Sequence, residues 1–334
     1  MAKTLQDQIL EEILNKYPKR SAAVEVLAEL LGVRKDAIYR RLRGDTILSP
    51  SEINLLAQKY KVSVDSYIFN QSEAISFNYS GFSREINNMG DYLDGVLENI
   101  NNLRRLPDIS VYYAATEIPF FYYSFFPELI SFKLYIWGRT IWEFEYLKNR
   151  PFDFDIISHP EMEKTQEVLK SYLELDTQEL WCPNIMHNTL GQIEYFVNMD
   201  VFKNIEDALT ICNRLLELVE HWKLMAKEGC KFMLDSGPDA PLSTFDLFHH
   251  EMLVTSDTIL AISSSNKVLF NIFNNPNYLA TSNEKMCSHQ EEWFKKAISK
   301  STPISRNNEK SRALYFNGLK RKIEATKSRI SLVD

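Results

Sequence analysis

The sequence has little glycine. Ten glycines occur in 334 residues, and none belongs to a Gly-x-Gly-x-x-Gly set, the loop with which many enzymes hold nucleotide phosphates. The Gly-x-Ser-x-Gly elbow that presents the nucleophile of many hydrolases is also missing. These absences exclude two large enzyme classes, and no other pattern favours catalysis. We therefore predict a protein that is not an enzyme and needs no cofactor.

The four cysteines are widely spaced and include no Cys-x-x-Cys pair, which argues against a zinc site or a disulfide framework. Free thiols are typical of a reducing cytoplasm. The N-terminal residues form a polar amphipathic pattern without the apolar core of a signal peptide, so we expect a cytoplasmic protein. The most apolar stretch, residues 120–147, is interrupted by Pro127 and several charged residues, and we expect no membrane span.

The protein also lacks an overall positive charge, since its net charge is −7. The charge is unevenly distributed along the chain. Residues 1–68 contain 11 basic and 9 acidic side chains, a net charge of +2, whereas the remainder carries −9. A slightly basic N-terminal part attached to an acidic body is compatible with nucleic-acid binding by the N-terminal part.

Residues 20–44 have the pattern of two short helices joined at Gly32. Apolar side chains recur at helical spacing, namely Val24, Leu27, Ala28, Leu30, Leu31, Val33, Ile38 and Leu42. We expect Ser21 to cap the first helix and Gly32 to adopt a positive φ angle. Residues 34–43 hold five basic residues and one acidic residue, a net charge of +4. The second helix therefore combines an apolar side with a strongly basic side.

This stretch resembles the lambda-repressor/Cro-like (XRE-type) helix-turn-helix family. The matching positions are Leu27, Ala28, Gly32, Val33, Ile38, Gly44 and Pro50, and the resemblance extends over about residues 5–69. The sequence differs from the family pattern at Arg41 and Leu42, where the family usually has an apolar residue and then an acidic or polar one. The resemblance implies an all-α helix-turn-helix head, residues 1–69, that binds double-stranded DNA. Because one such unit contacts few base pairs, we expect a homodimer.

By the same resemblance, the second helix presents side chains to base edges, and the start of the preceding helix contacts phosphates. The predicted DNA-binding residues are Lys19, Ser21, Arg34, Lys35, Asp36, Tyr39, Arg40 and Arg43. Arginine and lysine suit this role because they donate to guanine O6 and N7. Three alternatives remain open: solvated charges on an ordinary helix pair, a helix-turn-helix that binds protein, and an enzyme with a DNA-binding head.

The rest of the chain has the pattern of a mixed α/β body, residues 83–334, after a linker at residues 70–82 with a short strand at 75–79. We expect a helix-rich fold with a small, partly antiparallel sheet that dimerises and senses an effector. The expected helices are 84–106, 128–147, 160–174, 185–199, 205–231, 291–299 and 312–330, and the expected strands are 109–115, 252–254, 259–263 and 268–273.

Aromatic residues are concentrated between Tyr112 and Tyr146, where 14 occur in 35 positions. One interpretation is a pocket for a small hydrophobic effector, because tyrosine and tryptophan add polar groups to an apolar wall. The candidate lining residues are Tyr112, Tyr122, Tyr123, Phe126, Tyr135 and Trp137. The alternative is that the same residues form core or a dimer interface.

Two histidine patterns are candidates for chemistry. His221-x-Lys223 partly matches a phosphodiesterase motif, but only one copy occurs and the expected Asp is Glu228. His249 and His250 are adjacent, so on a strand their imidazoles would point to opposite faces and not converge on a metal. We expect no metal site.

Overall fold

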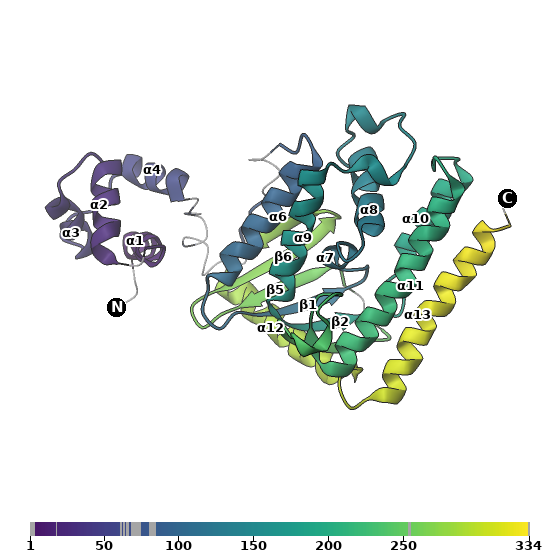
Figure 1. Ribbon diagram of the computed structural model, residues 1–334. Coiled ribbons are helices and arrows are strands. Elements are labelled where there is room, and N and C mark those ends of the chain that lie inside the picture. Colours follow the sequence, from purple (N-terminus) through teal and green to yellow (C-terminus); the bar gives the residue numbers. More distant parts are fainter. Residues whose placement is uncertain are drawn as a thin grey trace. The chain divides into compact units, whose positions relative to one another are not determined.

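The computed structural model describes residues 4–17, 19–60, 62, 64, 67, 75–79, 85–252 and 255–332. Their contacts divide the chain into two compact units, Met1–Phe77 and Asn78–Asp334, which we call the head and the body (Figure 1). The division falls within residues 70–82, and most of that segment lies outside the described residues.

The described helices of the head are α1 (Leu5–Asn15), α2 (Arg20–Leu30), α3 (Lys35–Leu42) and α4 (Pro50–Tyr60). They enclose one apolar core that includes Leu27, Ile38 and Leu56. Gly32 has φ +64° and turns the chain between α2 and α3, as predicted. The expectation that Ser21 caps α2 is wrong. The helix begins at Arg20, its N-cap residue is Lys19, and no side-chain hydrogen bond caps this end. Ser21 therefore lies inside the first turn.

Within the described residues, the body has an eight-stranded mixed sheet in the order β3-β4-β2-β1-β5-β6-β7, with β8 paired to β4. The strands are β1 (Ser110–Ala115), β2 (Asp176–Trp181), β3 (Cys230–Lys231), β4 (Ser243–His249), β5 (Thr258–Ile262), β6 (Lys267–Asn274), β7 (Asn277–Thr281) and β8 (Thr302–Pro303). The central strands β1, β2 and β4 are parallel, and β5, β6 and β7 continue as an antiparallel meander. The body is thus α/β, as expected, with a larger sheet than the sequence indicated.

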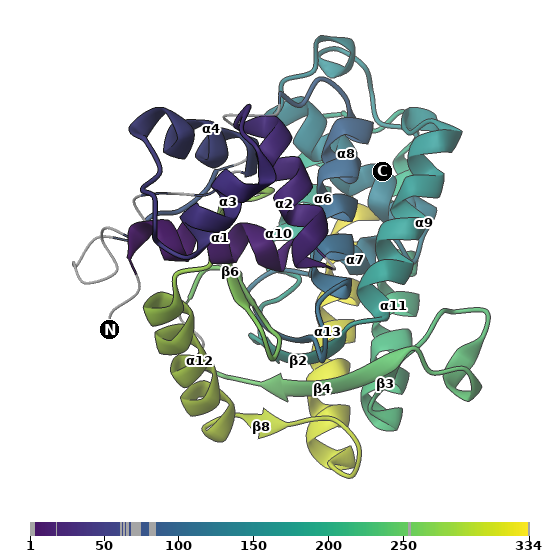
Figure 2. The ribbon, with the colours of Figure 1, turned by 90° about the vertical axis from the view of Figure 1, so that its left-hand side faces the viewer.

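The helices of the body lie on both faces of this sheet (Figures 1 and 2). Helices α6, α9 and α11 cover one face, and α12 covers the other. The body helices are α6 (Met89–Arg104), α7 (Phe120–Tyr123), α8 (Pro127–Thr140), α9 (His159–Leu173), α10 (His187–Asn198), α11 (Ile205–Glu228), α12 (Glu284–Ser299) and α13 (Glu309–Ile330). Successive residues of β1 alternate between the two faces: Tyr113 belongs to the α6 side, whereas Tyr112 stacks on Phe294 of α12 with ring centroids 5.3 Å apart.

Several expected elements have different bounds. The helix expected over 128–147 ends at Thr140, because the chain reverses and packs Leu147 against Gly138. A Cβ atom at Gly138 would lie 2.6 Å from the Leu147 Cδ1 atom, so a side chain here would force Leu147 to shift. Strands β2, β3, β4, β7 and β8 were not predicted, and β3 lies within the expected helix 205–231, which ends at Glu228. The strand expected at 252–254 is wrong at Met252, which lies in a turn, and its other two residues are outside the described part.

Within the expected strand at 75–79, Asn78 forms an isolated bridge with Ala280 of β7. No helix in the described part of the chain is both long enough and apolar enough to cross a bilayer, and residues 120–147 contribute α7 and α8 to the core.

Candidate nucleic-acid interface and body cavity

All eight residues predicted to bind DNA have exposed side chains. Lys35, Asp36, Tyr39 and Arg40 lie along α3, Arg34 and Arg43 flank it, and Lys19 and Ser21 lie at the start of α2. The opposite side of α3 packs into the head core through Ile38, which is 1% exposed. Within the described residues of the head, the basic side of α3 therefore lies outside the apolar core.

The cations on this surface differ in their partners. Lys35 forms an ion pair with Glu25 of α2, and this pair lowers the pKa of the Glu25 carboxyl. Arg43 is paired with Asp45 at 2.8 Å. Arg34 and Arg40 form no ion pair with any described residue. Their guanidinium groups are therefore available to an external anion without breaking an internal pair.

Arg41, where the sequence departs from the family pattern, points inward. Its Nη2 atom lies 2.7 Å from Glu52 Oε1, and the two side chains are only 12% and 17% exposed. Its Nη1 donates to the Ala37 carbonyl, while Gln6 Nε2 donates to the Arg41 carbonyl. Arg41 thus ties α3 to α4 and α1, and is not part of the exposed basic surface. The Ser49-x-x-Glu52 spacing, a capping-box signal, could have indicated where Glu52 lies.

The six residues proposed for an effector pocket lie elsewhere. Tyr122, Tyr123, Phe126, Tyr135 and Trp137 are at most 8% exposed and belong to the main core of the body. Tyr112 faces α12 on the opposite side of the sheet. None of the six lines the cavity described below, and the burial of five of them agrees with the core interpretation.

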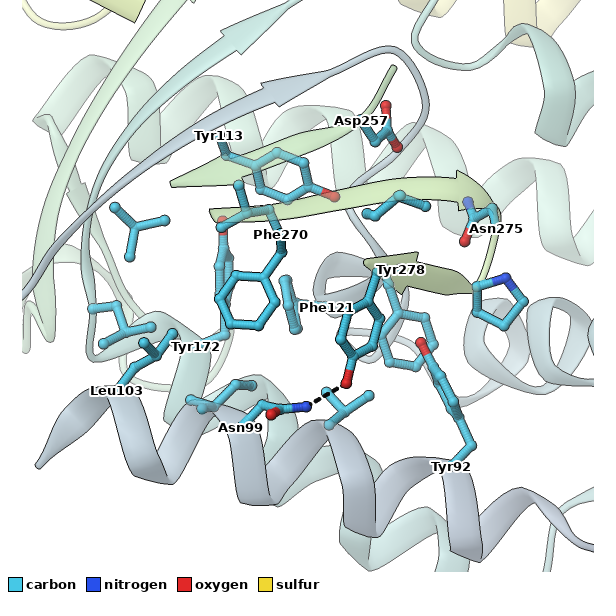
Figure 3. Close-up of a pocket in the computed structure, with 18 of the residues that line it drawn as sticks. Tyr92, Asn99, Leu103, Tyr113, Phe121, Tyr172, Asp257, Phe270, Asn275 and Tyr278 are labelled. Atoms are coloured by element: carbon cyan, nitrogen blue, oxygen red, sulfur yellow. Dashed lines mark hydrogen bonds between the residues drawn. The ribbon is translucent and has the colours of Figure 1, made fainter. Parts of the chain in front are cut away.

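That cavity lies between α6 and the sheet and has a volume of about 100 Å³ (Figure 3). Its walls are largely aromatic and aliphatic, with rings from Phe121, Phe270 and Tyr278. Tyr278 accepts a hydrogen bond from Asn99 Nδ2 of α6 at 2.6 Å, which joins β7 to the helix across the cavity. The lining comes from α6, α7, α9 and four strand regions, so no local sequence window contains it.

Polar groups collect at one end of the cavity, where β1 ends and β5 begins. Asp257 is 7% exposed and accepts two hydrogen bonds on Oδ1, from the Thr116 amide at 2.6 Å and its hydroxyl at 2.7 Å. Burial raises the pKa of the Asp257 carboxyl. Tyr113 is 2% exposed, lines the cavity, and its hydroxyl has no hydrogen-bond partner among the described residues. Figure 3 shows this hydroxyl directed toward the end that carries Asp257 and Asn275.

A buried charged network lies beside the cavity. Glu179 of β2 is fully buried and accepts hydrogen bonds from the Tyr122 and Tyr172 hydroxyls at 2.6 Å each. The Trp181 indole donates to its other oxygen at 2.8 Å. Lys231 donates to the Tyr172 carbonyl, and burial lowers the pKa of Lys231 to about 7. The donors that satisfy Glu179 belong to the core, so we assign this network to stability.

The histidine candidates are not brought together. His221 lies inside α11, bonded to the Phe232 carbonyl, and burial lowers its pKa to about 4, which keeps the ring neutral near pH 7. His249 ends β4 against the Tyr315 ring, while His250 Nδ1 accepts from the Met252 amide. Among the described residues, no three His, Cys, Asp or Glu side chains are grouped so as to hold a metal ion.

No protein-family model matches the chain, and no curated protein or solved structure is significantly similar to it.

Proposed function

We propose that this protein is a cytoplasmic, sequence-specific, DNA-binding transcriptional regulator that inserts α3 into the major groove. The observation that carries the proposal is the asymmetry of α3. One side packs into the head core, while the other presents Arg34 and Arg40 exposed and unpaired with any described residue. Such a side chain can donate two hydrogen bonds to guanine without losing an internal partner.

The body completes the proposal as a dimerising and effector-sensing unit. A single head offers only a few base contacts, so two heads are needed for useful specificity. The acidic body would disfavour non-specific attachment to DNA, leaving the head as the contacting surface.

The salt dependence of binding tests this proposal on any duplex. If a dimer neutralises about six phosphates, log K should fall with log salt at a slope of about −5. Affinity of the full-length protein for a fluorescent duplex should therefore drop roughly a thousandfold between about 50 and 200 mM salt. Anisotropy titrations measure this directly. An affinity that does not change with salt concentration would contradict a phosphate-contacting surface and favour the protein-binding alternative.

A further inference from the structure

The body cavity has the features of a binding site for a small molecule that is apolar over most of its surface and polar at one end. Its end near Asp257 carries the Tyr113 hydroxyl, which faces the cavity and has no hydrogen-bond partner among the described residues. A ligand that fills the cavity would keep water from this hydroxyl, and leaving it unpaired would then cost about 1–3 kcal/mol, so a ligand group that bonds to it is favoured. A pure hydrocarbon would leave the hydroxyl unpaired.

The charged residue in the cavity lining favours a ligand with a positive charge. Among the described residues that line the cavity, Asp257 is acidic and none is lysine, arginine or histidine. The nearby Lys133 is already paired with Glu117, and Asn275 Nδ2 donates to that same Glu117. Thr116 occupies Oδ1 of Asp257, and a carboxylate offers about four acceptor positions, so capacity remains for a further donor. A carboxylate ligand would face Asp257 with no counterion.

The walls select the shape of the ligand. Rings from Phe121, Phe270 and Tyr278 surround the apolar part, and aromatic rings pack well against each other and against cations. The volume of about 100 Å³ is of the same order as a cavity that holds one benzene ring. The cavity volume therefore limits the ligand to a compact molecule with no more than one ring.

We propose that this cavity binds a small arylalkyl amine, with its ring among the aromatic walls and its ammonium group on Asp257 and Tyr113. The idea that this cavity is the effector site of a regulator rests on the proposed function. The binding of the amine itself does not require DNA. The placement also suits regulation: Tyr278 lies on β7, and β7 pairs through Ala280 with Asn78, the first residue of the body after the head.

Calorimetric titration of the full-length protein, without DNA, tests the proposal with three probes of similar shape: 2-phenylethylamine, 2-phenylethanol and 3-phenylpropionate. Both the ammonium and the alcohol hydroxyl can donate to Asp257, but only the ammonium adds a charge–charge attraction, so the amine should bind at least about tenfold more tightly than the alcohol. The acid should bind most weakly. Failure of all three to bind, or acid binding as tight as that of the amine, would overturn the proposal.

Paired variants locate the site. Asp257→Asn should weaken amine binding about tenfold and leave alcohol binding nearly unchanged, whereas Tyr113→Phe should weaken both severalfold. Asp176→Asn is the matched control for the first, because Asp176 accepts the same two bonds from Thr244 but does not line the cavity. Tyr112→Phe is the control for the second, since Tyr112 lies on the opposite sheet face.

Near-ultraviolet circular dichroism of each variant separates lost binding from lost folding. Equal effects of the control and cavity variants, or natively folded cavity variants that bind the amine normally, would contradict the assignment. If the protein binds the amine but not DNA, the cavity assignment holds and the proposed regulatory function is wrong. If the protein binds DNA but not the amine, only the cavity assignment is wrong.

Discussion

The double variant Lys35→Ala Arg40→Ala is expected to lose at least about a hundredfold of affinity for specific DNA. Each side chain that bonds well to a base contributes about 1–3 kcal/mol of discrimination, and a dimer presents both residues twice. Arg40 is the stronger of the two candidates, because Lys35 must first leave its ion pair with Glu25. Anisotropy titration of the variant on a selected duplex measures the loss.

A control for this experiment removes the same charge elsewhere. Lys59 of α4 and Arg321 of α13 are exposed and form no ion pair with a described residue, so Lys59→Ala Arg321→Ala lowers the net charge equally. This control should bind specific DNA within a few-fold of the unaltered protein at fixed salt. If both double variants lost affinity equally, only net charge would matter and α3 would not be the reading helix.

The variant Glu179→Gln is expected to lower the free energy of unfolding of the body by about 2–5 kcal/mol. Glu179 is fully buried and acts only as an acceptor, for Tyr122, Tyr172 and Trp181. A glutamine amide oriented toward the two tyrosines would place its NH₂ group against the Trp181 N–H, so two donors would meet without an acceptor. Because these two donors lie in the core, water cannot act as a substitute acceptor for them.

Tryptophan emission during denaturant unfolding reports this change selectively, since all five tryptophans lie in the body. Glu167→Gln is the matched control, because Glu167 is exposed on α9 and its substitution should change stability by less than about 0.5 kcal/mol. A Glu179→Gln protein as stable as this control would show that the network contributes nothing measurable.

The head was largely predictable because its signals are local. Gly32 and Ile38 are set by the spacing of two consecutive helices, and the structure has them where the pattern placed them. Arg41 was not predictable from its own helix, since its orientation depends on Glu52 of α4. The exposed basic residues followed from the pattern, and their role in DNA binding remains a prediction.

The body was less predictable because its decisive contacts are distant in the sequence. Strand β2 was missed since Gln178 and Glu179 make it look polar, and Glu179 is buried only because Tyr122 and Tyr172 supply donors. The cavity beside α6 was missed for a related reason. Consecutive tyrosines on β1 face opposite sides of the sheet, and only the positions of α6 and α12 decide that Tyr113, not Tyr112, borders a cavity.

Selection of duplexes from a random pool by the full-length protein shows whether α3 reads DNA sequence. We expect enrichment of a palindromic consensus whose half-sites are about one helical turn apart, because two copies of α3 would read two successive major grooves. Substitution of Arg40 by alanine should abolish the enrichment. A pool that shows no consensus after repeated selection, or a consensus retained by the Arg40→Ala protein, would contradict DNA reading by α3.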